Sequence, residues 1–144
     1  MKIKKQLMMF LVMALTCVSA VCFASHGTDL DAEERYVDQF MAGKDYAKVS
    51  AFIDPQLAKN VTREQYTNLF AKMNQDLGKL VKKELRAYEL FDDGHVLHYV
   101  IGFEKAPVMV LDVVFKKTGD KVSMLNFRIL DAANNKKQES KEKK

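Results

Sequence analysis

The chain has 144 residues, with 23 basic and 19 acidic side chains and a formal net charge of +4. This length has room for one domain. The excess positive charge lies at the two ends, because residues 25–133 hold 15 basic and 17 acidic side chains. A nucleic-acid-binding protein needs a basic face on its folded part, so we expect no nucleic-acid partner.

The N-terminal segment predicts a cleavable export signal. Three of the first five residues are lysine, and an uncharged apolar run follows from Leu7 to Val21. Cys22-Phe23-Ala24 then places small residues at the positions that a signal peptidase reads before a cut between Ala24 and Ser25. We therefore expect a signal peptide over 1–24 and an exported protein, periplasmic or extracellular, with no stable membrane span after cleavage.

Two alternatives to cleavage stay open at this segment. An uncleaved anchor is one, since Leu7 to Ala24 spans 18 residues, near the lower limit for crossing a bilayer. Lipid attachment at Cys17 or Cys22 is the other. Both cysteines lie within the signal, so the mature protein has no disulfide and must be stabilised by its core alone.

Helical patterns fill the first half of the mature chain. A first helix is expected over Thr28 to Gly43, with Thr28 or Asp29 as its cap and Gly43 as its end. A short second helix is expected over Asp45 to Ile53, and one further helical turn over Pro55 to Asn60.

The third expected helix starts at a capping box, in which Thr62 caps the first turn and Gln65 reaches back. Gly78 ends it. Its apolar residues recur at helical spacing on one face, and we expect Phe70 among them to anchor the core between helices and sheet. This stripe consists of Tyr66, Leu69, Phe70, Met73 and Leu77.

Four strand-like runs follow, joined by short connections. Asp93-Gly94, Lys105-Ala106-Pro107 and Thr118-Gly119-Asp120 are expected as hairpin loops, which gives an antiparallel meander. The charged tail from Asn134 to Lys144 is expected to be disordered. The four runs are Leu80 to Phe91, His95 to Phe103, Val108 to Lys116 and Lys121 to Leu130.

The order of elements predicts an α+β domain over 25–133, with three N-terminal helices packed on one face of a four-stranded antiparallel meander. A two-residue loop at Asp93-Gly94 sets the register and the two faces of the sheet. The expected helix-facing side holds Leu85, Ala87, Phe91, Val96, His98, Val100, Met109, Leu111, Val113, Phe115, Leu125, Phe127 and Ile129. The expected outer face holds Arg86, Tyr88, Leu97, Tyr99, Ile101, Phe103, Val108, Val110, Asp112, Val114, Met124, Asn126 and Arg128. So apolar an outer face indicates a homodimer, and Phe103→Asp is expected to break it.

This layout resembles the nuclear transport factor 2-like superfamily, and within it the small secreted bacterial domains of unknown function. The resemblance rests on the helix from Ala32 to Tyr46, the helix from Thr62 to Leu77 with Gly78, and the strands from Leu80 to Leu130. It implies a curved, cone-like sheet with a pocket between helices and sheet, where the family's enzymes often place an Asp or His. The secreted members have no assigned activity, and fold does not imply function.

Two groups of residues are candidates for a site. His98 on the helix-facing side, with Tyr66, Phe70 and Met73, would form a binding pocket, although the plainer interpretation is a core histidine and a core aromatic stripe. Asp112 interrupts an apolar run and needs a polar partner. We expect it in an outer-face polar row with Tyr99, Asn126 and Arg128. The three histidines are too scattered to bind a metal, and we expect no cofactor.

The leading functional hypothesis is an exported, non-enzymatic domain that binds a small hydrophobic ligand or a protein partner. One alternative is a small-molecule isomerase or hydrolase that uses His98 or Asp112, and another is a dimeric structural or adaptor module. A histidine and a carboxylate meeting in one open cavity would favour the enzyme. The expected register places His98 and Asp112 on opposite faces of the sheet, against that alternative.

Overall fold

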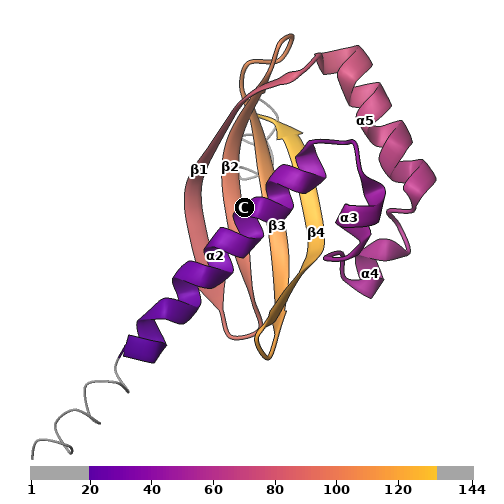
Figure 1. The fold of residues 1–144 in the computed structure, drawn as a ribbon. Coiled ribbons are helices and arrows are strands. Elements are labelled where there is room, and N and C mark those ends of the chain that lie inside the picture. Colours follow the sequence, from indigo (N-terminus) through magenta and orange to yellow (C-terminus); the bar gives the residue numbers. More distant parts are fainter. Residues whose placement is uncertain (1–19, 133–144) are drawn as a thin grey trace, which may run out of the picture. The chain divides into compact units, whose positions relative to one another are not determined.

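The computed structural model describes residues 20–132 and has four helices and four strands within them (Figure 1). Most of the predicted export signal and the tail from Asn134 lie outside these residues, and the expected cut after Ala24 falls within α2. Within the described part of the chain, no helix is both long enough and apolar enough to cross a membrane. The helices are α2 (Ala20–Met41), α3 (Tyr46–Ser50), α4 (Pro55–Ala58) and α5 (Arg63–Leu77), and the strands are β1 (Leu80–Phe91), β2 (Gly94–Phe103), β3 (Met109–Thr118) and β4 (Lys121–Asp131).

The chain divides into two compact units between Glu34 and Arg35, inside α2. The last turns of α2, the other helices and the sheet belong to the second unit, and the following description concerns that unit. The expected start of the first helix was wrong, since α2 runs through Thr28 and Asp29 from Ala20 and uses neither as a cap.

Local side-chain chemistry fixes the starts of the shorter helices. Asp45 caps α3 by accepting from the backbone N–H of Lys48, and Asp54 caps α4. The capping box of α5 is confirmed: Thr62 Oγ1 accepts from Gln65 N at 3.3 Å, and Gln65 Oε1 accepts from Thr62 N at 3.0 Å.

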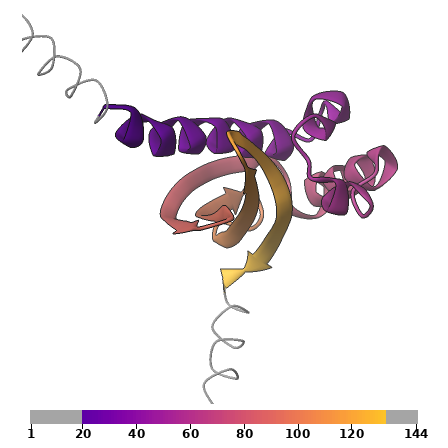
Figure 2. The same cartoon turned by 90° about the horizontal axis from the view of Figure 1, so that it is seen from below.

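The sheet is an open antiparallel meander with strand order β1-β2-β3-β4, as predicted. Its strands follow a curved path in the end-on view of Figure 2. A bulge interrupts the pairing on β1 between Leu85 and Ala87, and another lies on β4, where Asn126 pairs with Val114 and Met124 with Phe115, so that Leu125 is the extra residue. The outer edge of β4 is partly covered by the segment before α4. The backbone N–H of Asp54 donates to Met124 O at 2.8 Å, and Ile53 forms a bridge with Met124.

The expected faces of β2 were wrong, because the first hairpin loop lies one residue earlier than predicted. Phe91 pairs with Gly94, so Asp92-Asp93 forms the loop. Gly94 does not supply a positive φ angle; it lies where a Cβ atom would come 2.1 Å from Phe115 O. Glycine is therefore needed for a close approach of β3, and every β2 side chain points to the face opposite the one expected.

The core lies between this inner face of the sheet and the helices. Leu97, Tyr99, Ile101 and Phe103 of β2 and Met124 of β4 are buried there, although they were expected on the outer face. Leu111, Val113 and Phe115 of β3 are buried there as predicted, and Val122 of β4 is buried with them. On the outer face β2 instead presents Val96, His98 and Val100. Tyr88 of β1 pairs with Leu97 and Ala87 with His98, so these two also exchange faces relative to the prediction.

Phe40 of α2 is the centre of this core. Its ring contacts Phe127 on β4 with centroids 4.6 Å apart, and it meets Tyr66 and Phe70 of α5 edge-on at 5.5 and 5.6 Å. Val37 and Met41 on the same side of α2 are also buried. Helices and sheet are thus joined through aromatic rings, which bury large apolar areas with defined geometry.

Candidate functional site

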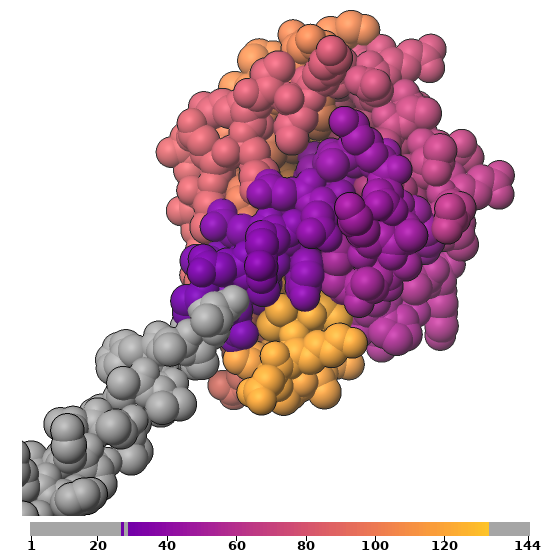
Figure 3. All heavy atoms as spheres, in the orientation of Figure 1, coloured from indigo at the N-terminus to yellow at the C-terminus, as the bar shows by residue number. Residues whose placement is uncertain are grey.

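A cavity of about 660 Å³ opens between the last turn of α2, α5, the start of β1 and the end of β2. We call it the α5 pocket. Figure 3 shows this side of the molecule, where α5 and β1 border the last turns of α2. Met41 and Phe103 are almost fully buried and form its floor, while Phe70, Met73 and Leu80 are half-buried and form its walls.

Two glycines shape the walls of the α5 pocket. Gly43 has φ +65° just after α2, and the ring of Phe70 packs so closely on it that a Cβ atom there would lie 2.6 Å from Phe70 Cγ. Gly78 has φ +78° and turns the chain from α5 into β1. Both conformations favour glycine, because other residues are strained at positive φ.

Hydrogen bonds hold the turn after α5 against the loop between β2 and β3. Lys79 N donates to Glu104 Oε2 at 2.9 Å, and Glu104 N donates to Lys79 O at 3.1 Å. Lys105 N donates to Leu77 O at 2.9 Å. The α5 pocket is therefore bordered by a tied turn on this side, which keeps the cavity preformed.

The rim of the α5 pocket is polar. Thr67 and Asn74 project from α5, and Lys44 and Lys79 stand in the turns after the two glycines. Asp38 of α2 is the acidic lining residue, and its carboxylate pairs with Lys83 Nζ at 2.6 Å. The cavity combines an apolar interior with a rim of mixed polarity in which lysine predominates.

The four residues predicted to share a pocket are separated by the structure. Phe70 and Met73 line the α5 pocket. Tyr66 is buried in the core beside it, where its hydroxyl donates to Phe40 O at 2.8 Å. Burial raises the pKa of Tyr66 to about 12, an effect that a hydrogen bond from the backbone of Gly43 opposes in part and the negative charge of Asp45 reinforces. The inner-face position predicted for His98 was wrong.

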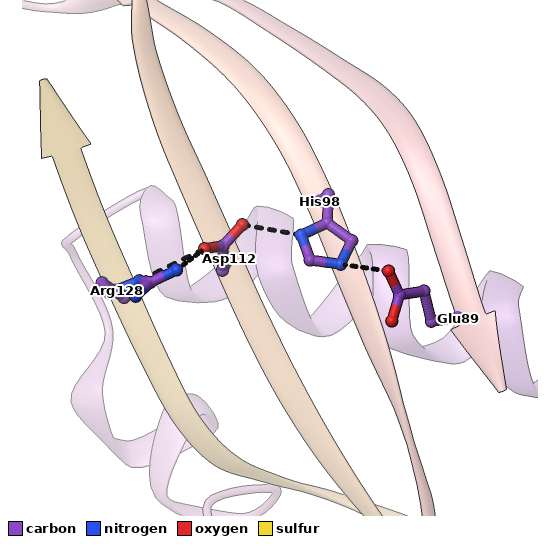
Figure 4. A network of polar contacts seen from close by, with 4 residues as sticks. All are labelled: Glu89, His98, Asp112 and Arg128. Carbon is purple, nitrogen blue, oxygen red and sulfur yellow. Dashed lines mark hydrogen bonds and ion pairs between the residues drawn. The ribbon is translucent and has the colours of Figure 1, made fainter. Parts of the chain in front are cut away.

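His98 instead joins a line of polar groups across the outer face of the sheet (Figure 4), which we call the outer-face row: Glu89, His98, Asp112 and Arg128. His98 Nδ1 lies 2.8 Å from Asp112 Oδ1, and His98 Nε2 lies 3.2 Å from Glu89 Oε1. Arg128 donates to Asp112 Oδ2 from Nη2 at 2.6 Å and from Nε at 3.2 Å.

The register explains which members of the predicted outer row are present. Asp112 pairs directly with His98 on one side and Arg128 on the other. Asn126 lies on the same face one pair further along, opposite Val114, and its Oδ1 accepts from Phe127 N. The prediction for Tyr99 was wrong, since its side chain is buried on the inner face. Glu89 was missed, because only the correct register brings it next to His98.

The outer-face row is well paired but poorly arranged for catalysis. His98 Nδ1 is hydrogen-bonded to Asp112, and Glu89 Oε1 lies 3.2 Å from Nε2 without forming a hydrogen bond, so a substrate would have to compete with that carboxylate for Nε2. Asp112 is engaged on both oxygens. Within residues 20–132 no group of three His, Cys, Asp or Glu side chains converges as a metal site would require.

A second cavity, of about 350 Å³, lies near the hairpin between β1 and β2 and is lined by Phe91, His95 and Phe115 among others. His95 is buried and its Nδ1 lies 3.0 Å from the Tyr88 hydroxyl. Neither this cavity nor the α5 pocket is lined by His98 or Asp112. His98 and Asp112 are therefore in contact on the outer face of the sheet, outside both of these cavities.

Comparisons with protein-family models, with curated proteins and with solved structures give no match to this chain.

Proposed function

We propose that this chain is an exported, non-enzymatic domain that binds a small, mostly apolar ligand in the α5 pocket. The observation that carries the proposal is the preformed cavity of about 660 Å³ with Met41 and Phe103 at its floor. Ligand-binding cavities fall at roughly 300–1,000 Å³ and are lined mostly by apolar side chains with a few polar groups. Methionine side chains such as Met41 and Met73 adapt to irregular ligands.

Export and family are part of the same proposal. The charged start, the apolar run and the small residues before Ser25 support cleavage and release outside the cytoplasm. Helices followed by an antiparallel meander support a nuclear transport factor 2-like domain with a cone-like sheet. In such a domain the α5 pocket would occupy the space between helices and sheet that the resemblance implies.

An isomerase or hydrolase acting through His98 or Asp112 is less well supported. The two side chains are in contact, which the sequence did not predict and which by itself would favour an enzyme. However, they lie outside both cavities, and Glu89 faces the second ring nitrogen of His98. A substrate would have to displace that carboxylate at a place on the sheet where neither cavity offers room to hold it.

Nuclear magnetic resonance of ¹³C-labelled methionine methyl groups tests the proposal with 1-octanol as a neutral apolar probe. The signals of Met41 and Met73 are expected to shift in a saturable way, because both side chains line the α5 pocket. Met109 and Met124 lie elsewhere on the sheet and serve as internal references, with signals expected to stay in place.

A blocking variant sharpens this test. Ala71 is an exposed lining residue on α5, so Ala71→Trp is expected to fill the cavity and abolish the shifts without disturbing the core. The control is Ala47→Trp, at an exposed position of α3 that does not line the cavity. Shifts that persist in Ala71→Trp, or that spread equally to all four methionines, would show that the pocket is not the site.

A second candidate function, homodimerisation, is favoured by the charge pattern of the outer-face row. The row is acidic at Glu89 on β1 and basic at Arg128 on β4, and both side chains are more than half exposed. A two-fold axis parallel to the strands would stack two outer faces with Glu89 of each copy over Arg128 of the other. Half-buried Val96, Val100 and Val114 would supply apolar contact around these pairs.

The basis for this dimer differs from the one expected from the sequence. Ile101 and Phe103 are buried in the core, so Phe103→Asp would unfold the protein instead of separating subunits. Glu89→Arg is the informative change, because it would face Arg128 of the partner with like charge. Glu84→Arg on the same strand is the control. The residues paired across the sheet from Glu84 end at Leu130 on β4, so in this dimer the new arginine would face an apolar side chain of the partner and no arginine. Sedimentation that shows a monomer for the unmodified protein at every concentration would refute the dimer.

A further inference from the structure

We propose that the ligand of the α5 pocket is an anionic amphiphile, whose acidic group binds at Lys44 and Lys79 while its apolar part fills the cavity. This inference rests on the proposed function, since it names the ligand class of the same pocket.

The two lysines are held at the rim by the backbone. Lys44 follows Gly43 and Lys79 follows Gly78, the two glycines with positive φ angles that shape the cavity. The peptide groups of Lys79 are tied on both sides to Glu104. The backbone of each lysine is therefore fixed at the rim, and only the flexible side chain must be ordered when a ligand binds.

The positive charge of the two lysines is uncompensated. Within residues 20–132 neither Lys44 nor Lys79 has a carboxylate partner within ion-pair distance. Glu104 uses a carboxylate oxygen to accept from the backbone N–H of Lys79 at 2.9 Å. The rim can therefore attract an anion without first breaking an existing pair.

The acidic lining residue does not cancel this field. Asp38 pairs with Lys83 Nζ at 2.6 Å, and although the Asp38 side chain is 62% exposed, the Lys83 side chain is only 19% exposed and stays beside it. Lys83 is held further by the face of the Tyr99 ring, 4.8 Å from its centroid. The lining therefore offers an incoming ligand two free cations against one neutralised acid.

Polar donors on α5 complement the lysines. Asn74 lines the cavity at the same side of α5 as Phe70, and its amide group is exposed. An amide N–H donates well to a carboxylate, sulfonate or phosphate oxygen. An apolar body between Phe70 and Phe103 with an acidic group at the rim would satisfy the floor and the rim together. A fully neutral ligand would leave the lysines unused, and a cationic ligand would be repelled.

The experiment compares three probes of equal chain length: octanoate, 1-octanol and octyltrimethylammonium. Binding is followed by the methionine methyl signals of Met41 and Met73. Octanoate is expected to bind most tightly and octyltrimethylammonium most weakly. The variant Lys44→Gln/Lys79→Gln is expected to bind octanoate about five-fold more weakly than the unmodified protein, since two exposed charge pairs are removed. Raising the salt concentration should produce a similar loss.

Controls separate this inference from the proposed function. The double variant should bind 1-octanol as the unmodified protein does, and Lys59→Gln, at an exposed lysine outside the cavity, should leave octanoate binding unchanged. If 1-octanol and octanoate bind equally in the pocket, or if the double variant loses nothing, the inference is wrong and the proposed function stands. If none of the three probes moves Met41 or Met73, both are wrong.

Discussion

Replacing Phe40 by alanine tests whether the core is centred where the structure places it. Phe40 is 1% exposed and touches the rings of Tyr66, Phe70 and Phe127. Truncating a fully buried phenylalanine costs about 3–5 kcal/mol, through lost burial and the cavity left behind. Domains of this size are stable by roughly 5–15 kcal/mol, so Phe40→Ala should lose a large share of the free energy of unfolding.

Phe70→Ala is the matched comparison, because the sequence alone pointed to Phe70 as the anchor. The Phe70 ring is half-buried and forms a wall of the α5 pocket, so part of its surface already faces a cavity. We expect a loss of about 1–3 kcal/mol, smaller than that of Phe40→Ala. Phe40→Leu, which keeps most of the volume, should lose about 1–2 kcal/mol and remain folded.

Urea denaturation at fixed pH measures all three variants on one scale. The expected order of midpoints is unmodified protein first, then Phe40→Leu close to Phe70→Ala, then Phe40→Ala. Equal midpoints for the two alanine variants, or a loss below about 1 kcal/mol for Phe40→Ala, would refute a core centred on Phe40.

Three further predictions concern single side chains. The unmodified protein should lose about 2–3 kcal/mol of stability between pH 10 and 12, because the unfolded chain releases the Tyr66 proton first, and Tyr66→Phe should flatten this slope in denaturation at a series of pH values. Gly43→Ala should destabilise the protein by about 1–3 kcal/mol, more than Gly119→Ala, because only at Gly43 would the added Cβ also meet a ring; equal losses in thermal melts would argue against that contact. Asp112→Ala should cost about 1–2 kcal/mol by leaving His98 without its hydrogen-bond partner, while Asp112→Asn should cost less; a neutral Asp112→Ala would mean that the outer-face row adds no stability.

Local chemistry made much of the fold predictable. Thr62 and Gln65 form their capping box within four residues of chain, and Asp54 before Pro55 caps its own turn. At the last hairpin Gly119 supplies the positive φ angle of a two-residue loop. In each case the residues that allow the prediction also make the contact, so the local structure does not depend on distant parts of the chain.

The faces of β2 were not predictable in the same way. Asp93-Gly94 has the composition of a tight hairpin, yet Gly94 is required by the approach of Phe115 from another strand. The bulge after Leu85 then shifts the register of β1 again. Because side chains alternate along a strand, one residue of slip moved His98 to the outer face and Tyr99 into the core.

The candidate site shows the same division. Phe70 and Met73 could be placed on one face of α5 from their spacing alone. The cavity that they line also needs the end of β2, and the position of Phe103 depended on the register that was missed. Contact between His98 and Asp112 likewise depends on strand pairing between distant segments, which no local pattern encodes.

Native mass spectrometry of the protein purified from its own host without refolding tests the central claim most directly. It reports the mature mass, the number of subunits and any small molecule that is retained. We expect the mass of 25–144 together with a bound small molecule of defined mass, which Ala71→Trp loses and Ala47→Trp keeps. An empty protein, or a molecule retained equally by both variants, would contradict ligand binding in the α5 pocket.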